Sequence, residues 1–343
     1  MNVTTYAVDT AKNVMQLHWV DGHTGEIGRR KLSRARFFEF FAQRPGSHVV
    51  MEACGGSHHL ARRLGALGHD VELLPARQVR PFVSGNKDDA ADARALWLAS
   101  RHPDIRRVPV KTEQQQAVLS LHRMRAHWSS VRTATLNALR ALLYEFGVVL
   151  PRGKACGLKT LAERRAEFDA QLPALMQRLV DQHLAALRQM DLEVKRIEAE
   201  LAAVQAADQN ARRLREVPGI GLLGATALSA TLGDARAWRR ARDFATSTGL
   251  TPRHTGTGGK VRMGGISKRG DPYLRTLLVS GARSLLNSPS APQWARQMLL
   301  RRPVNVVVVA LANKLARTAW ALVAHDGAFD RRWGRPGAVG TTG

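Results

Sequence analysis

Four carboxylates in the first third of the chain are placed where they could bind metal ions. Asp9 lies inside the apolar run YAVDT, and Glu52 ends another, HVVME, shortly before a Gly-Gly turn. Asp89 and Asp92 are three residues apart and share one face if they lie on a helix; Asp88, four residues before Asp92, is the alternative to Asp89. Hard divalent cations prefer carboxylate oxygens. Two such ions about 4 Å apart can stabilise the attacking and leaving oxygens of a phosphodiester.

Each of these carboxylates also has a purely structural interpretation. Asp9 could start a turn, Glu52 could pair with an arginine such as Arg62, and Asp88 or Asp89 could cap a helix. The combined order is more specific than any single residue, because it places Asp on a first strand, Glu on a later strand and Asp-x-x-Asp on a helix. That order resembles an RNase H-like, RuvC-type nuclease core.

The charge balance predicts a polyanionic partner. The 343 residues include 52 Lys and Arg against 28 Asp and Glu, for a formal net charge of +24. Such an excess is typical of proteins that bind nucleic acid. No apolar run approaches the roughly 20 residues that span a bilayer, no signal peptide is recognisable, and two cysteines give neither a disulfide framework nor a zinc pattern. We therefore expect a cytoplasmic, nucleoid-associated protein without a membrane partner.

The hydrophobic pattern predicts an α/β domain followed by helical ones. Residues 1–108 read as an RNase H-like domain, 109–215 as a helical coiled-coil oligomerisation region, 216–330 as a mainly helical C-terminal domain, and 331–343 as a disordered tail. Expected strands cover 4–11, 15–20, 48–53 and 70–75, and expected helices 37–43, 58–68 and 91–100.

A heptad seam marks the helical region. It consists of Leu187, Met190, Val194, Ile197, Leu201 and Val204. An antiparallel hairpin within one chain and a coiled coil between two chains explain this seam equally well. The Gly/Pro/Lys-rich stretch 147–159 is expected to be a loop.

Two segments of the second half are candidates for nucleic-acid contact. The stretch VPGIGLLGATAL resembles half of a helix–hairpin–helix, in which Gly219 and Gly221 would let backbone N–H groups approach a phosphate. A tight helix–helix turn without a ligand is the alternative. A glycine-rich segment from 253 to 275, expected to be a loop, carries six basic residues: Arg253, Lys260, Arg262, Lys268, Arg269 and Arg275. If all six contact phosphates, log K should fall with log salt at a slope of about −5.

Six stretches of the chain together resemble DEDD-type insertion-sequence transposases. They are VDTAK, MEACGG, NKDDAADA, VPGIG, GLTPRHTGTGGK and GISKRGDPYLRTLL, which occur in the family's order over roughly residues 5 to 325. Members have a RuvC-like N-terminal domain and a C-terminal serine-type transposase domain, and characterised relatives are guided by a bridge RNA. The resemblance implies that Asp9, Glu52, Asp89 and Asp92 are the catalytic metal ligands for Mg²⁺ or Mn²⁺, with two ions, which selects Asp89 over Asp88.

The resemblance also implies a hydroxyl nucleophile in the C-terminal domain. Family members carry a serine in the context Pro-x-x-x-x-Ser-Gly, whereas this chain has Pro252 followed by Thr257 and Gly258. A threonine hydroxyl can attack phosphorus, although its extra methyl group crowds the approach. Thr257 is therefore the expected nucleophile, and Thr255 and Ser267 are the alternatives.

By the same resemblance, the expected reaction is RNA-guided, metal-dependent strand cleavage and exchange between donor and target DNA. It would pass through a covalent hydroxyl-linked intermediate in a dimer or tetramer of the chain. Two alternatives stay open. One is a metal-dependent nuclease like a Holliday-junction resolvase, and the other is a catalytically impaired nucleic-acid-binding relative.

Overall fold

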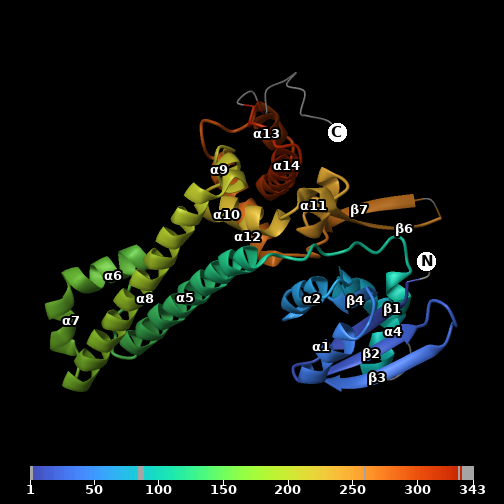
Figure 1. Ribbon diagram of the computed structural model, residues 1–343. Coiled ribbons are helices and arrows are strands. Elements are labelled where there is room, and N and C mark those ends of the chain that lie inside the picture. The colour runs from blue at the N-terminus through green and yellow to red at the C-terminus, as the bar shows by residue number, and fades with distance from the viewer. Residues whose placement is uncertain (1–2, 84–88, 259, 331–332, 334–343) are drawn as a thin grey trace. The chain divides into compact units, whose positions relative to one another are not determined.

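The computed structural model describes residues 3–83, 89–258, 260–330 and 333; of Asp89 and Val261 only the backbone is described. The chain divides into two compact units (Figure 1). Unit 1 comprises Met1–Gln116 together with Gly233–Arg239, and unit 2 comprises Ala117–Leu232 and Arg240–Gly343. Asp88 lies outside the described residues, as does the predicted tail apart from Trp333.

Within the described residues, unit 1 is built on a five-stranded mixed sheet. Its strands are β1 (Thr5–Thr10), β2 (Val14–Val20), β3 (Ile27–Ser33), β4 (His48–Glu52) and β5 (Asp70–Leu74). They follow the order β3-β2-β1-β4-β5 across the sheet, with β1–β2 and β2–β3 antiparallel and β1–β4 and β4–β5 parallel. Because β1 and β4 are parallel neighbours, the strand ends that carry Asp9 and Glu52 meet at one edge of the sheet.

Helices cover both faces of this sheet. Helices α1 (Arg34–Ala42) and α2 (Ser57–Ala66) pack on one face, where Phe37, Phe41 and Leu64 are fully buried. Helix α4 (Asp89–Ser100) packs on the other face through its alanines and a leucine. The short helices α3 (Ala76–Val79), η1 (Arg80–Phe82) and η2 (Ala235–Ala237) complete the unit. Successive side chains of a strand point to opposite faces of the sheet, so every second residue of a strand faces α4.

Strand β3 is absent from the sequence-based expectations, whereas the other four strands are confirmed to within about two residues. Its sequence, IGRRKLS, has three consecutive cations, and only Leu32 is buried. An edge strand contacts a neighbour on one side only, so it needs few apolar residues and shows little alternation. A hydrophobic pattern cannot reveal such a strand.

Unit 2 contains a long antiparallel helical hairpin. Helices α5 (Glu113–Tyr144) and α8 (Ala174–Ala207) run side by side in opposite directions. Arg125 bonds Glu198, and Arg132, one heptad further along α5, bonds Asp191 one heptad back along α8. The heptad seam packs along α5 in the same chain, with Leu187, Val194 and Leu201 buried. The seam is thus used within the chain.

The remaining helices form the body and the tip of unit 2. They are α6 (Lys154–Glu163), α7 (Arg165–Gln171), α9 (Gln209–Arg215), α10 (Leu222–Leu232), α11 (Ala241–Ser247), α12 (Pro272–Leu286), α13 (Gln293–Leu299) and α14 (Val304–Ala324). The expectation of a loop over 147–159 is wrong from Lys154 onward, where α6 begins after Gly153. Trp333 donates its indole N–H to the hydroxyl of Thr318 on α14 at 3.0 Å.

Helix α14 corrects one expectation from composition. It is long and apolar enough to span a membrane by length and composition, contrary to the statement that no run approaches that length. However, 56% of its apolar window is buried inside the unit, where α14 packs against α11 and α12. That is the environment of a core helix.

The glycine-rich segment after residue 251 is a β-ribbon rather than a loop. Strands β6 (Pro252–Thr257) and β7 (Lys260–Ile266) pair antiparallel, with an irregularity between Pro252 and His254. All residues of β6 are exposed. Glycines weaken the strand signal and no buried face exists to reveal alternation, so the sequence alone favoured a loop.

Candidate active site

The first carboxylate, Asp9, is positioned by strand β1. Ala7 and Val8 are fully buried on opposite faces of the sheet, Ala7 toward α4 and Val8 toward α1 and α2. Side chains alternate along a strand, so Asp9 lies on the α4 face with Ala7. Asp9 is half-buried and stands opposite Gln16 of β2.

The second carboxylate, Glu52, ends strand β4 on the same face. Its strand neighbour Val50 packs toward α4, and Glu52 follows two residues later. The last parallel pair of the register is Val8 with Met51, so Glu52 comes next to Asp9 along the two strands. Just beyond them, Thr10 Oγ1 and Cys54 Sγ lie 3.1 Å apart, which ties the two strand ends together.

Helix α4 brings the third carboxylate to this face. Asp92 is half-buried in the first turns of α4, one residue before the buried Ala93. Burial raises the pKa of Glu52 above its usual value, and the charge of Asp92 raises it further. The two carboxylates are therefore close enough to repel each other. Asp89 begins the same helix, but its side chain is outside the described part of the structure.

The structure excludes the proposed ion pair between Glu52 and Arg62. The Arg62 guanidinium donates instead to the Lys111 carbonyl and to Gln116 Oε1, both at 2.6 Å. Neither Glu52 nor Asp92 forms an ion pair with a described residue. An uncompensated pair of half-buried carboxylates is costly unless a cation joins it. This donor set, with oxygen atoms only, fits a hard divalent cation.

No group of three or more described His, Cys, Asp or Glu side chains is assembled as a metal site. The Asp89 carboxylate lies outside the described side chains, so the tetrad of Asp9, Glu52, Asp89 and Asp92 stays a prediction. Asp9 and Glu52 lie at the ends of two adjacent parallel strands on the α4 face, and the charge of Asp92, on α4, acts on Glu52.

The second candidate centre is the tip of the β6–β7 ribbon. Thr257 is the cross-strand partner of Lys260, and Thr255 is the partner of Arg262. Cross-strand partners share a face, and so do residues two apart on one strand. Both hydroxyls and both cations therefore lie on one exposed face. The pair His254 and Met263 lies on the other.

Comparisons with known proteins place the chain in a family. A model described as a transposase, DEDD_Tnp_IS110, matches residues 7–147, and a model of the transposase IS116/IS110/IS902 family matches residues 211–298. The chain is 43% identical, over 98% of its length and 100% of the relative, to a "probable family 20 transposase" of Pseudomonas aeruginosa. It is 40% identical, over 96% of its length and 99% of the relative, to the transposase for insertion sequence element IS1328 of Yersinia enterocolitica.

The chain belongs to the IS116/IS110/IS902 family of transposases. A third relative, the transposase for IS1111A of Coxiella burnetii, is 35% identical over 95% of this chain and 91% of its own length. The matched families span both the carboxylate face of unit 1 and the ribbon of unit 2. As a transposase, the protein is an enzyme that cuts and recombines DNA.

The remaining predicted cations of the transposase differ in what they contact. Lys268 and Arg269 are exposed in the segment between β7 and α12. Arg275 instead donates to the Thr248 carbonyl at 2.9 Å and so holds the end of α11. Two glycines allow this segment to pack closely: a Cβ on Gly270 would lie 1.7 Å from the Ser247 carbonyl oxygen, and a Cβ on Gly249 would lie 2.4 Å from the Arg269 carbonyl oxygen.

The glycines of the turn between α9 and α10 also have different surroundings. Gly219 has φ +92°, and a Cβ there would come within 3.0 Å of the Gly281 carbonyl oxygen on α12. A Cβ on Gly281 would lie 1.9 Å from the Gly219 carbonyl oxygen. This mutual close approach explains both glycines by packing alone. Gly221 is exposed, and a Cβ added there would meet no atom within 4 Å.

Sequence reasoning missed a buried polar network in the transposase. His122 of α5 is almost fully buried, with Nδ1 2.9 Å from the Tyr273 hydroxyl and Nε2 3.0 Å from Thr226 Oγ1. Thr226 donates its own proton to the Leu222 carbonyl, so Nε2–H donates to Thr226 and Nδ1 accepts from Tyr273. Burial and Arg125 lower the pKa of His122 to about 4, which keeps the ring neutral. The available signal was His122, four residues after Val118 on the same helix face.

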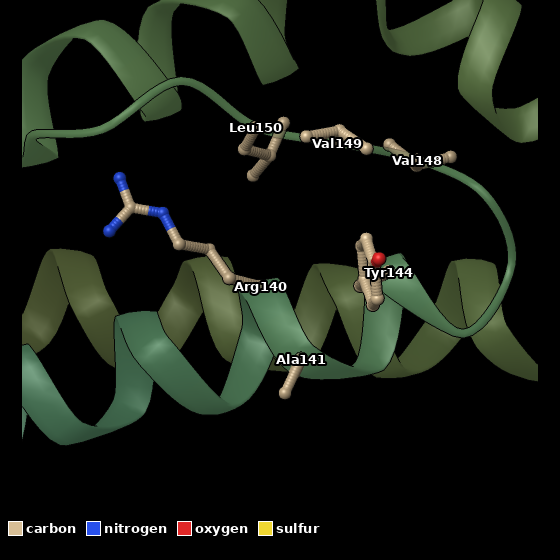
Figure 2. Close-up of a pocket in the computed structure, with 6 residues that line it drawn as sticks. All are labelled: Arg140, Ala141, Tyr144, Val148, Val149 and Leu150. Atoms are coloured by element: carbon tan, nitrogen blue, oxygen red, sulfur yellow. The ribbon is translucent and has the colours of Figure 1, made fainter.

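A shallow pocket at the tip of the long hairpin is unrelated to this chemistry. Figure 2 shows its lining: Arg140, Ala141, Tyr144, Val148, Val149 and Leu150. Its volume is about 250 Å³. The lining holds no carboxylate, and the guanidinium of Arg140 donates to the carbonyls of Pro151 and Gly153. We assign this pocket no part in DNA cleavage.

Proposed function

We propose that this transposase is an RNA-guided DNA recombinase whose cleavage depends on divalent metal ions and passes through a covalent protein–DNA intermediate. The observation that carries the proposal is that Asp9 and Glu52 lie at adjacent strand ends on the α4 face of the sheet, where the charge of Asp92 acts on Glu52. The proposed substrates are donor and target DNA, with a guide RNA that supplies sequence recognition by base pairing.

The proposal includes an RNase H-like, RuvC-type fold for the N-terminal domain. Support comes from the strand order β3-β2-β1-β4-β5, with an antiparallel meander followed by two parallel strands. It also comes from a helix, α4, that follows the last strand and covers the face bearing Asp9. We retain 1–108, 109–215 and 216–330 as the proposed catalytic, helical and C-terminal transposase regions.

Asp9, Glu52, Asp89 and Asp92 would hold the metal ions, with Mg²⁺ or Mn²⁺ and two ions as the proposed complement. Bound there, the cations would polarise the scissile phosphodiester and stabilise the charge that develops on its oxygens. The part played by this chain is to hold oxygen ligands on rigid strand ends. The repulsion between Glu52 and Asp92 supports cation binding, because a cation would relieve it.

Thr257 is the proposed nucleophile, with Thr255 and Ser267 as alternatives. Its hydroxyl oxygen would attack phosphorus, form a new phosphodiester with the DNA and release the sugar oxygen of the broken bond. Lys260, its cross-strand partner, would hold the phosphate oxygens. Arg253, Arg262, Lys268 and Arg269 are proposed to contact nucleic-acid backbone, and the assembly is proposed to be a dimer or tetramer acting in the cytoplasm at the nucleoid.

The test combines RNA sequencing with two single substitutions. The protein is expressed together with its flanking element DNA, and the RNA that copurifies is sequenced. We expect one discrete, structured RNA from an end of the element. We also expect Asp9→Ala to abolish metal-dependent cutting and Thr257→Ala to abolish the covalent adduct.

Other outcomes would replace this proposal. Random cellular RNA, combined with intact metal-dependent cutting of branched DNA, would favour a nuclease like a Holliday-junction resolvase. Absence of both cutting and adduct in the wild-type protein, with nucleic-acid binding intact, would favour a catalytically impaired relative. The observation that favours a catalytically impaired relative is the threonine, Thr257, at the position of the family serine.

A further inference from the structure

The exposed edge strand β3 extends the row of residues that contains the candidate carboxylates. Lys31 of β3 pairs with Gln16 of β2, and Gln16 pairs with Asp9 of β1. Cross-strand partners point to the same face, so Lys31, Gln16, Asp9 and Glu52 form one row on the α4 face. The row begins with a cation at the open edge of the sheet and ends with two carboxylates.

Two further cations lie on the same face beside this row. Arg29, two residues before Lys31, pairs with His18 of β2. His18 is buried against Trp97 of α4, and its pKa is lowered first by burial and then by the charges of Arg29 and Arg94. The guanidiniums of Arg29 and Arg94 therefore approach one imidazole from the strand and from the helix.

These three cations have no acidic partner within the described part of the chain. Arg29, Lys31 and Arg94 are exposed, and none forms an ion pair with a described Asp or Glu. Cations without an acidic partner gathered on one face are available to an anionic ligand. The ligand must also be compatible with carboxylates at the far end of the row, which a phosphodiester chain crossing a metal-binding site would be.

We propose that Lys31, Arg29 and Arg94 form a phosphate-binding track that guides the DNA strand to be cut from the edge strand β3, across β2, toward Asp9, Glu52 and Asp92. This inference rests on the proposed function of those carboxylates. Two strand spacings of about 4.8 Å separate the backbone of Lys31 from that of Asp9. A strand rising about 3.4 Å per nucleotide along a duplex covers this distance within three nucleotides. The track thus contacts phosphates immediately beside the scissile one.

Charges on an edge strand also have a simpler role, because they discourage pairing with the edge of another sheet. That role makes no distinction between the two faces of β3. Arg30, between Arg29 and Lys31, points to the opposite face, where its guanidinium lies 5.5 Å from the centre of the Phe40 ring. It is equally cationic, exposed and on the same strand. Arg30 is therefore a matched control within one tripeptide.

The experiment measures how salt weakens binding of a fluorescent DNA duplex to the full chain, in EDTA so that no cutting occurs. Each phosphate contact contributes about 0.9 to the slope of log K against log salt. We expect the double variant Arg29→Gln/Lys31→Gln to reduce the magnitude of the slope by about 1.8, and Arg94→Gln by about 0.9. Arg30→Gln should leave it unchanged. Thermal unfolding of each variant checks that the fold is retained.

A second measurement locates the contact. The photoreactive residue p-benzoylphenylalanine is placed at position 31 in one protein and at position 30 in another. We expect Lys31→p-benzoylphenylalanine to crosslink to DNA beside the cut, and Arg30→p-benzoylphenylalanine to give no such product. This readout does not depend on the contribution of other basic residues to overall affinity.

Three results would overturn the inference: an unchanged slope in Arg29→Gln/Lys31→Gln, an equal loss in Arg30→Gln, or crosslinks from position 31 to RNA only. Failure of the proposed function has a different signature, since it would appear as metal-dependent cutting that survives Asp9→Ala. A variant set that loses cutting through Asp9→Ala, but keeps its slope without Arg29 and Lys31, removes the track and leaves the active site in place.

Discussion

Thr257 and Lys260 stand opposite each other as the last pair of an exposed two-stranded ribbon, with the cation and the hydroxyl on the same face. A positive charge beside the attacking oxygen stabilises the phosphate as the new bond forms. We expect Lys260→Ala to lower the rate of adduct formation by roughly a hundredfold, the scale found when one such group is removed from an active site. The adduct is measured on denaturing gels.

The ribbon itself supplies the controls for that experiment. Met263→Ala alters an exposed side chain on the opposite face and should leave adduct formation unchanged. Thr257→Ser keeps the hydroxyl and removes the crowding methyl group, so it should retain the adduct, whereas Thr257→Ala should lose it. An adduct that persists in Thr257→Ala would transfer the role to Thr255 or Ser267.

The like charges of Glu52 and Asp92 predict how the protein responds to Mg²⁺. In EDTA, Asp92→Asn should unfold at a higher temperature than the wild type, because it removes the repulsion that raises the pKa of Glu52. Added Mg²⁺ should reverse this order. At 100 times its Kd, a ligand adds about 2.7 kcal/mol of stability to the protein that binds it. Equal stabilisation of both proteins by Mg²⁺ in thermal unfolding would argue against a metal site at Asp92.

The buried histidine predicts a loss of stability in mild acid. The pKa of His122 is about 4 in the folded protein, below its ordinary value of 6.5. Between these values the unfolded chain binds a proton that the folded chain does not, so stability falls as pH drops from 6.5 to 4. The fall is at most roughly 1.4 kcal/mol per pH unit. Urea unfolding across this range measures it.

Two substitutions on the same helix isolate this effect. His122→Gln should make the pH dependence shallower because it removes one titrating group, while His18, whose pKa is also lowered by burial, remains. His127→Gln, at an exposed position of α5, should keep the wild-type dependence. If both variants titrate like the wild type, the acid sensitivity originates elsewhere in the chain.

The two glycines of the turn between α9 and α10 have different predicted roles: Gly219 packs against α12, and Gly221 is open to a ligand. Gly219→Ala should destabilise the protein by about 1–3 kcal/mol, because its Cβ must fit against α12 in a left-handed backbone conformation. Gly221→Ala has open space and should leave stability unchanged. If Gly221 approaches a phosphate, the same variant should weaken DNA binding. Chemical denaturation and DNA titration of both variants give the answer.

The sequence predicted those features that depend on alternation within a buried element. Asp9 and Glu52 follow short apolar runs that are buried on both faces, so their position at adjacent strand ends could be inferred. The β6–β7 ribbon and strand β3 were not predicted, because almost none of their side chains is buried. A strand is recognised in a sequence by the alternation of buried and exposed side chains. The role of His122 could not be predicted for a different reason. Its hydrogen-bond partners lie 104 and 151 residues away in the chain, and the sequence pattern does not show that they come together.

The heptad seam shows a different limit. Its spacing predicted that a helix would pack along that line, but not which helix. The pairs Arg125 with Glu198 and Arg132 with Asp191 identify α5 as the partner. The charged residues of α5 and α8 show which helix is the partner only when the two helices are known to be antiparallel.

The lengths of α5 and α8 set the distance between the tip of the hairpin and the rest of unit 2. Its helices contain 32 and 34 residues, so at 1.5 Å per residue they extend about 48 and 51 Å. Because side-chain packing between them repeats every seven residues, the hairpin can be shortened only in steps of about 10 Å, by removing one heptad from each helix. Any other deletion turns the tip around the helix axis. Deletions or insertions that keep the packing can therefore change the distance from the pocket at the tip to the body of unit 2 only in whole-heptad steps.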